Sequence, residues 1–119
     1  MHLSFNLIPL VLLVANEAAA TKILFQQTVT VFLPVRTGVL ITDDNHYHNI
    51  GFRDSGCTNA GLSFVKEMCI DGSKQRAHIY WTNQPNKKYC FAQQPSEHTN
   101  CGQWQTCSRW EFTETPCTW

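Results

Sequence analysis

Two histidines flank a tyrosine in the run His46-Tyr47-His48. In a β-strand, alternate side chains point to the same face, so the two imidazoles would lie side by side. Such a pair could share a metal ion, with Asp43 or Asp44 as a further ligand, or act as a base and its partner. The plainer interpretation is two exposed histidines at a strand edge, and we predict neither a metal ion nor a cofactor for this chain.

A second set of residues, read in chain order, has the side chains that RNA cleavage needs. Tyr47 and His48 are followed by Glu67, Arg76 and His98. The reaction requires a base for the 2′-hydroxyl, a cation for the charge that develops on the phosphate, and an acid for the leaving oxygen. The order resembles that of the small secreted guanyl-specific ribonucleases of fungi. The resemblance implies His48 or Glu67 as the base. It also implies that Arg76 steadies the phosphate and that His98 is the acid.

Two spacings differ from those of that ribonuclease family. Tyr47 and His48 are adjacent, and Glu67 and Arg76 are closer in the chain than the family's pattern has them. A cross-strand ion pair between Glu67 and Arg76 would explain these two residues without catalysis. No Ser-His-Asp spacing, phosphate-cradling glycine loop or Cys-x-x-Cys motif occurs in the sequence.

The four tryptophans all lie in the C-terminal third of the chain. Trp81 is expected in the hydrophobic core. Trp104, Trp110 and Trp119 lie among polar residues and are candidates for an exposed aromatic patch, which would suit a partner protein or stacking on sugar rings. The alternative is that these three pack over disulfides as a small core of their own.

The N-terminus has the features of a secretory signal peptide. The apolar run from Leu7 to Ala15 is shorter than the about 20 residues that a membrane span needs. The small-residue triplet Ala18-Ala19-Ala20 follows it and suits signal peptidase. We therefore expect residues 1–20 to be removed and residues 21–119 to form one domain. That domain would be secreted, extracellular, and able to pass into a host.

Six cysteines all lie within that domain. An even number of cysteines in a short secreted chain predicts three disulfides, and their connectivity cannot be deduced from sequence. We expect one of the first two cysteines to pair with the C-terminal cluster, so that a stapled C-terminal segment, residues 90–119, is tied to a β-rich body. Residues 21–56 have no cysteine and must be held by strand pairing and burial. The cysteines are Cys57, Cys69, Cys90, Cys101, Cys107 and Cys117.

The hydrophobic pattern predicts a mainly β protein. Alternating or β-branched runs predict strands at residues 28–33, 39–42 and 46–52, and residues 53–61 are rich in turn formers and predict a loop. No helix of ten or more residues is predicted, although one short helix is compatible with the sequence. A small disulfide-stapled antiparallel sheet or sandwich is the expected fold.

Asp71-Gly72 is the strongest turn signal, because Asp-Gly between two strand-like runs favours a two-residue hairpin turn. Ile70 would then face Ser73, and the same register places Glu67 opposite Arg76. Cys69 would point away from the core, so its disulfide should fasten a segment over the outer face. The β-strand residues expected on the core face are Leu62, Phe64, Lys66, Met68 and Ile70.

Composition excludes several functional classes. The chain has 9 basic and 9 acidic residues and a net charge of zero, whereas nucleic-acid-binding domains usually have a pI above roughly 9. Hydrophobic residues make up 43%, too many for a disordered chain. No second apolar run of membrane length follows residue 20, so we expect no membrane partner.

The signal peptide, the six cysteines, the short domain and the β-rich pattern together resemble the small secreted cysteine-rich effectors of filamentous fungi. The resemblance implies a secreted protein that binds a host protein or shields the pathogen, without catalysis, and we expect this chain to be a monomer. A secreted ribonuclease, or a catalytically dead relative of one, is the alternative. A module that binds cell-wall carbohydrate is the third expectation.

Overall fold

The computed structural model describes residues 20–119, and these residues form one curled antiparallel sheet with three disulfides. The prediction of a mainly β, disulfide-stapled fold is confirmed. The predicted signal peptide, apart from Ala20, lies outside the described residues. The elements are β1 (Lys22–Val29), β2 (Pro34–Ile41), β3 (Tyr47–Asn49), β4 (Ser55–Thr58), β5 (Val65–Asp71), the 3₁₀ turn η1 (Gly72–Lys74), β6 (Arg76–Trp81), β7 (Gln84–Gln93), β8 (Glu97–Gly102) and β9 (Gln105–Thr115).

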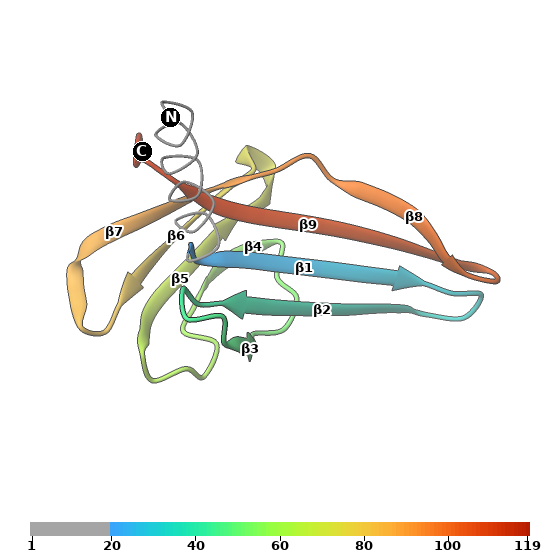
Figure 1. The fold of residues 1–119 in the computed structure, drawn as a ribbon, viewed down its shortest axis with the longest axis horizontal. Helices are drawn as coiled ribbons and strands as arrows, with labels where there is room; N and C mark the ends of the chain where they lie inside the picture. Colours follow the sequence, from blue (N-terminus) through green and yellow to red (C-terminus); the bar gives the residue numbers. More distant parts are fainter. Residues whose placement is uncertain (1–19) are drawn as a thin grey trace, which may run out of the picture.

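The strands follow the order β3-β2-β1-β9-β7-β6-β5-β4, with β8 paired to β9 outside this path. The first and last strands, β1 and β9, are therefore neighbours in the middle of the sheet. The inner end of β9 pairs with β7 and its outer end pairs with β8. As a result β1, β2, β8 and β9 extend together as a long arm on the right of Figure 1, while β4 to β7 curl round at the other end.

The core lies inside the curl and follows the two-residue period of the strands. Ile23 and Phe25 of β1 point inward, as do Met68 and Ile70 of β5, and all four are at most 4% exposed. Phe52, from the segment after β3, lies 5.5 Å from the ring centroid of Phe25 and helps to close the curl. The ten buried hydrophobic residues of the core cluster are Ile23, Phe25, Leu40, Val65, Met68, Ile70, Ala77, Ile79, Phe91 and Phe112.

The β5–β6 hairpin forms where Asp71-Gly72 predicts it, but with a longer turn. Ile70 pairs with Ala77 rather than Ser73, a shift of four residues. The cause is local. The Asp71 carboxylate accepts hydrogen bonds from the Lys74 amide and the Ser73 hydroxyl and caps η1, and Gln75 then takes a left-handed conformation with φ of 55°. Because the shift is even, Met68 and Ile70 stay on the core face as expected.

The predicted Glu67–Arg76 pair is wrong, because the shifted register places Tyr80 opposite Glu67. Arg76 instead pairs with Asp71, with 4.0 Å between Nε and Oδ2. A β-bulge between Val65 and Glu67 also reverses which side chains at the start of β5 face the core.

The bulge explains three further differences at the start of β5. Val65 is buried although the alternation places it outside, and Lys66 is exposed although the same alternation places it in the core. Phe64, also expected in the core, is 37% exposed. Leu62 does pack against the core cluster as predicted.

The predicted strand at residues 28–33 is wrong in its second half. β1 ends at Val29, and residues 30–33 make the turn to β2. The Thr30 hydroxyl accepts hydrogen bonds from the amides of Phe32 and Leu33, and this local bonding competes with strand pairing. The predicted strands at 39–42 and 46–52 correspond to the end of β2 and to the short β3, and the predicted loop at 53–61 contains β4.

The disulfides join Cys57 to Cys69, Cys90 to Cys117, and Cys101 to Cys107. None of them links the first two cysteines to the C-terminal cluster, so that expectation is wrong. Cys57 and Cys69 are directly opposed on β4 and β5, with 4.0 Å between their Cα atoms, and the bridge ties an edge strand rather than a covering segment. Residues 90–119 are stapled as predicted, because Cys90–Cys117 and Cys101–Cys107 both lie within them, but they are not a separate tail, because β9 is a central strand. The cysteine-free part, β1 to β3, is held by strand pairing and burial, as predicted.

Candidate functional site

The residues of the ribonuclease hypothesis lie on four strands, β3, β5, β6 and β8, and their side chains have different partners. The His48 ring, on β3, packs edge-on against Phe64 at 4.9 Å between centroids. His98, on β8, has its Nδ1 2.8 Å from the hydroxyl of Ser108 on β9. Tyr47 is 70% exposed. His48 therefore contacts an aromatic ring and His98 contacts a hydroxyl, and neither histidine contacts the other.

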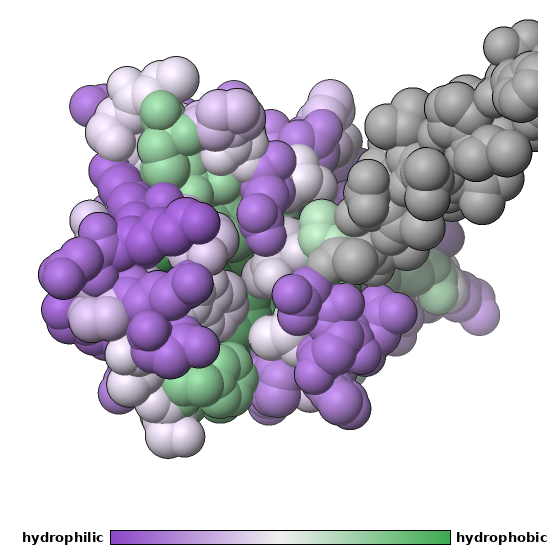
Figure 2. All heavy atoms as spheres, turned by 60° about the vertical axis from the view of Figure 1, so that its left-hand side comes forward, coloured by the Kyte–Doolittle hydropathy of each residue, from purple (hydrophilic) through white to green (hydrophobic). Residues whose placement is uncertain are grey.

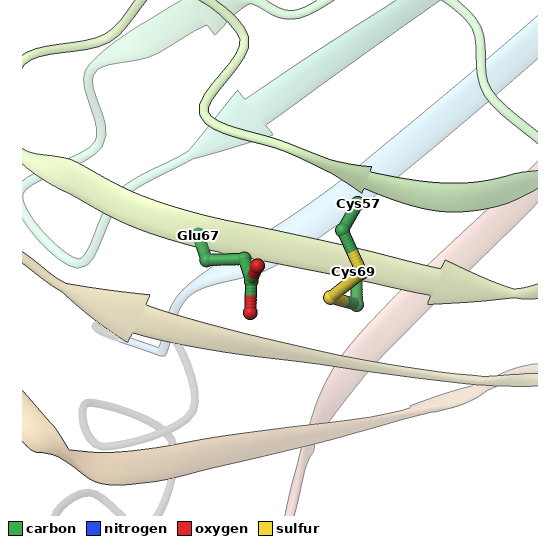
Figure 3. A group of neighbouring side chains, drawn as sticks. All are labelled: Cys57, Glu67 and Cys69. Carbon is green, nitrogen blue, oxygen red and sulfur yellow. A yellow bond between two sulfur atoms is a disulfide. The ribbon is translucent and has the colours of Figure 1, made fainter.

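Arg76 and Glu67 also have local roles. The Arg76 guanidinium lies 5.1 Å above the ring of Trp119 and faces Asp71. Glu67 lies next to the Cys57–Cys69 disulfide, as Figure 3 shows. Because both sulfurs are bonded to each other, neither is a thiolate, and the cluster therefore offers a metal ion only the Glu67 carboxyl group.

The three C-terminal tryptophans do not form one patch. Trp110 is half-buried and contacts Phe52 at 5.9 Å between centroids. The ring of Trp119 is half-buried and lies beside Arg76 and Lys88. Trp104 alone is strongly exposed, at 77%, in the turn between β8 and β9. Trp81 is half-buried and packs against the core, close to its expected place.

Trp104 belongs to a different surface, the apolar tip, which we define as Val29, Val31, Phe32, Leu33, Val35 and Trp104. All six side chains are at least 39% exposed, and Phe32 reaches 88%. The β1–β9 register pairs Val29 with Thr106, which brings the β1–β2 turn beside the β8–β9 turn at the end of the arm. The sequence interpretation missed Val31, Phe32 and Leu33 because it placed them in a strand. The Thr30 hydroxyl that caps the turn was the available signal.

The tip combines apolar side chains with polar groups that carry no charge. Residues 28–35 and 99–107, which form the outer ends of the two hairpins, include no Asp, Glu, Lys, Arg or His. β3 pairs only with residues 39–41 of β2, and β8 pairs with β9 on one side. Within residues 20–119, the outer part of β2 and the outer side of β8 therefore have open backbone edges next to the apolar side chains.

A second feature lies at the other end of the molecule, a hollow of about 840 Å³ that we call the aromatic hollow. Phe64, Trp81 and Tyr89 line it together with His48. The Phe64 and Trp81 rings are stacked with their centroids 6.3 Å apart, and Tyr89 meets Trp81 edge-on at 6.2 Å. Figure 2 shows this end of the molecule, with hydrophobic side chains between hydrophilic ones.

The charged groups of the aromatic hollow are acidic groups and histidines. Asp44 accepts hydrogen bonds from the Thr42 hydroxyl and from the His46 ring, whose Nδ1 is 2.7 Å from Oδ2. The bond from Thr42, followed by that from His46, lowers the pKa of Asp44 far below its ordinary value. Glu114 accepts a hydrogen bond from the Thr21 amide at 3.3 Å. His46, just before β3, and His48, within β3, both line the hollow, but their rings have different partners.

No protein family, curated protein or solved structure shows significant similarity to this chain. Within residues 20–119, no helix is long and apolar enough to span a membrane. The function therefore has to be inferred from the apolar tip and the aromatic hollow themselves.

Proposed function

We propose that this chain is a secreted protein that acts by binding a partner protein through its apolar tip, without catalysis. The observation that carries the proposal is the exposure of Phe32 and Trp104, at 88% and 77%, in two adjacent turns that contain no charged residue. Large aromatic side chains are costly to leave in water and supply much of the binding energy of protein interfaces.

Secretion is supported by the cysteines and by the start of the fold. All six cysteines are in disulfides, which persist in oxidising compartments. β1 begins at Lys22, so cleavage after Ala20 would leave every described strand intact. The same layout is that of the secreted effectors which the sequence resembles, and a host protein is the partner class that this resemblance favours.

A protein suits the tip better than a lipid bilayer does. The open edges of β2 and β8 present backbone N–H and C=O groups that hydrocarbon cannot satisfy. A partner protein can satisfy them by adding a strand, while its own side chains cover Phe32 and Trp104. The amides of Gln103 and Gln105 beside Trp104 would also be costly to place in lipid.

The absence of catalysis is proposed because His48, Glu67, Arg76 and His98 have separate structural partners. A ribonuclease remains testable by incubating the mature protein with RNA. RNA cleavage that disappears in His48→Ala would contradict a binding function without catalysis.

The binding proposal is tested by placing a photo-cross-linking phenylalanine analogue at position 32, with position 47 on β3 as the matched exposed control. A protein captured from 32 but not from 47 is then purified and titrated directly against the wild type, the double variant Phe32→Ser/Trp104→Ser, and Tyr47→Ser. Loss of one interface hot spot costs at least about 2 kcal/mol, so the double variant should bind more than about 30-fold more weakly. Tyr47→Ser should bind like the wild type.

Equal affinity of the double variant and the wild type would contradict the proposal. Binding to phosphatidylcholine or phosphatidylserine vesicles that the double variant loses would identify a lipid surface instead, and would also overturn it.

A further inference from the structure

We infer that the aromatic hollow is a second binding site, and that its ligand is a neutral oligosaccharide. The site is separate from the apolar tip, so this inference does not depend on the proposed partner protein. It also moves the expected carbohydrate contact from the C-terminal tryptophans to Phe64, Trp81 and Tyr89.

The aromatic rings provide the apolar part of such a site. Sugar rings have apolar C–H faces that pack on aromatic rings, and hydroxyls at their edges that need hydrogen-bond partners. His48, Phe64, Trp81 and Tyr89 form a row in which each ring contacts the next, at 4.9, 6.3 and 6.2 Å between centroids. Phe64 is 37% exposed, and the other three rings are half-buried, so their positions are fixed by packing. A rigid row of rings is suited to more than one sugar unit.

Short polar side chains surround the row and provide the hydrogen-bonding part. Thr42, Asn83 and Gln84 all line the hollow. The Oε1 of Gln84 accepts a hydrogen bond from the Tyr89 hydroxyl. This bond orients the Gln84 amide and leaves the NH₂ group of Gln84 as a donor. Ligand sites of this kind combine aromatic walls with a few placed polar groups.

The charges of the hollow select a neutral ligand over an anionic one. No Lys or Arg lines the hollow, whereas Asp43, Asp44 and Glu114 do. A phosphorylated, sulfated or uronic acid ligand would meet these three carboxylates. Lys87 has its Nζ 4.9 Å from the centroid of the Tyr89 ring but is not a lining residue, and an ammonium at Thr21 would already be paired with Glu114.

Two of these three carboxylates, those of Asp44 and Glu114, are not free for a cationic ligand. Asp44 is already bonded to Thr42 and His46, and Glu114 to the Thr21 nitrogen. If cleavage occurs after Ala20, that nitrogen becomes a charged ammonium and pairs with Glu114 directly. An amine ligand would have to displace these partners, while a sugar hydroxyl could bond beside them.

The test is titration calorimetry of the secreted protein with three neutral hexasaccharides, of chitin, cellulose and xylan, together with the intrinsic tryptophan fluorescence of the protein. At least one of them should bind with a Kd below about 1 mM. Phe64→Ala and Asn83→Ala, two exposed positions, should each weaken that binding about tenfold or more. Trp104→Ala, at the opposite end of the molecule, should bind like the wild type. Unfolding curves of each variant show that the fold is retained.

Three outcomes would overturn the inference. The first is no saturable binding to any of the three hexasaccharides. The second is binding that Phe64→Ala and Asn83→Ala leave unchanged, which would place the sugar elsewhere. The third is tighter binding of choline, spermidine or an oligogalacturonate in the hollow than of the neutral sugars, which would assign it to a charged ligand. Failure of the tip to bind a partner protein has no bearing on these results.

Discussion

His78, in the middle of β6, lies between Cys69 of β5 and Cys90 of β7. Burial is the first cause of its lowered pKa, and the positive charges of Lys88 and Arg76 act in the same direction, while Glu67 opposes them. The unfolded chain, with a pKa near 6.5, therefore binds more protons at mildly acidic pH than the folded protein does. The contribution of His78 to stability is present above that value and is lost as pH falls below it.

We predict that His78→Gln reduces the loss of stability between pH 7 and pH 5. Glutamine cannot take up a proton, so this part of the pH dependence disappears. Urea unfolding at several pH values measures it, and pH 8 is the reference because the imidazole is neutral in both states there. An unchanged slope of unfolding free energy against pH would show that His78 has no such effect.

Gly38, a buried residue of β2, allows a close approach of two backbone segments. A Cβ at this position would lie 2.0 Å from the Gly51 carbonyl oxygen and 2.8 Å from Cδ1 of Phe25. The Gly38 carbonyl also accepts a hydrogen bond from the Ile50 amide, so the segment after β3 cannot move away freely.

Gly38→Ala should cost about 2 kcal/mol or more, because backbone and a buried ring would have to shift. For a domain of this size the Tm should fall by roughly 8–16 °C. Gly102→Ala is the control, since its Cβ would meet only the flexible end of Gln105. Calorimetry of the two variants should separate them clearly, and similar melting temperatures would contradict the proposed close approach.

At the scale of the elements, the β5–β6 hairpin shows what local sequence can predict. Asp71-Gly72 marked the turn, and the two-residue period marked Met68 and Ile70 as core. The register could not be predicted, because it depends on how the Asp71 side chain caps the turn. The bulge after Val65 could not be predicted either, because it depends on a contact with another strand. It depends on pairing with Trp81, and a local pattern does not include that contact.

In the candidate sites, too, local sequence predicts single residues but not which residues come together. Trp104 was predicted as an exposed aromatic residue and is one. Phe32, its neighbour on the apolar tip, belongs to another hairpin and is brought close only by the β1–β9 pairing. The aromatic hollow likewise joins loops near β3, β5 and β7, so its lining could not be read from any one segment.

The disulfides differ in how much of the chain they constrain. Cys90–Cys117 spans 27 residues and ties the end of the chain to β7, while Cys101–Cys107 spans 6 residues within the β8–β9 hairpin. In the chain-entropy account, a longer closed loop removes more freedom from the unfolded state.

We predict that Cys90→Ala/Cys117→Ala lowers the free energy of unfolding by about 3.5 kcal/mol, against about 2 kcal/mol for Cys101→Ala/Cys107→Ala. The loss of volume at buried Cys90 adds to the first figure. Urea denaturation of the two oxidised double variants gives both values. A larger cost for the short loop would mean that native contacts of the Cys101–Cys107 bridge, rather than chain entropy, decide the difference.

At the scale of the whole molecule, the fold depends on the last strand reaching the first. β9 lies between β1 and β7, and it contributes Phe112 to the core. Local patterns do not indicate this pairing, because residues 90–119 lack a regular apolar period and their four cysteines suggest a stapled segment rather than a central strand. Antiparallel pairing between the two ends of a domain is a long-range contact, and local propensity does not report it.

This topology predicts how truncated chains behave. Residues 21–104 should show no cooperative unfolding, because without β9 the strands β3-β2-β1 lose their connection to β7-β6-β5-β4. Residues 21–115 are the matched control. They lack Cys117 but keep all of β9, so they should unfold cooperatively with a loss of about 3.5 kcal/mol from the missing bridge. Circular dichroism during urea unfolding distinguishes the two cases. A cooperative transition in 21–104 would mean that the two halves of the sheet fold without the strand that joins them.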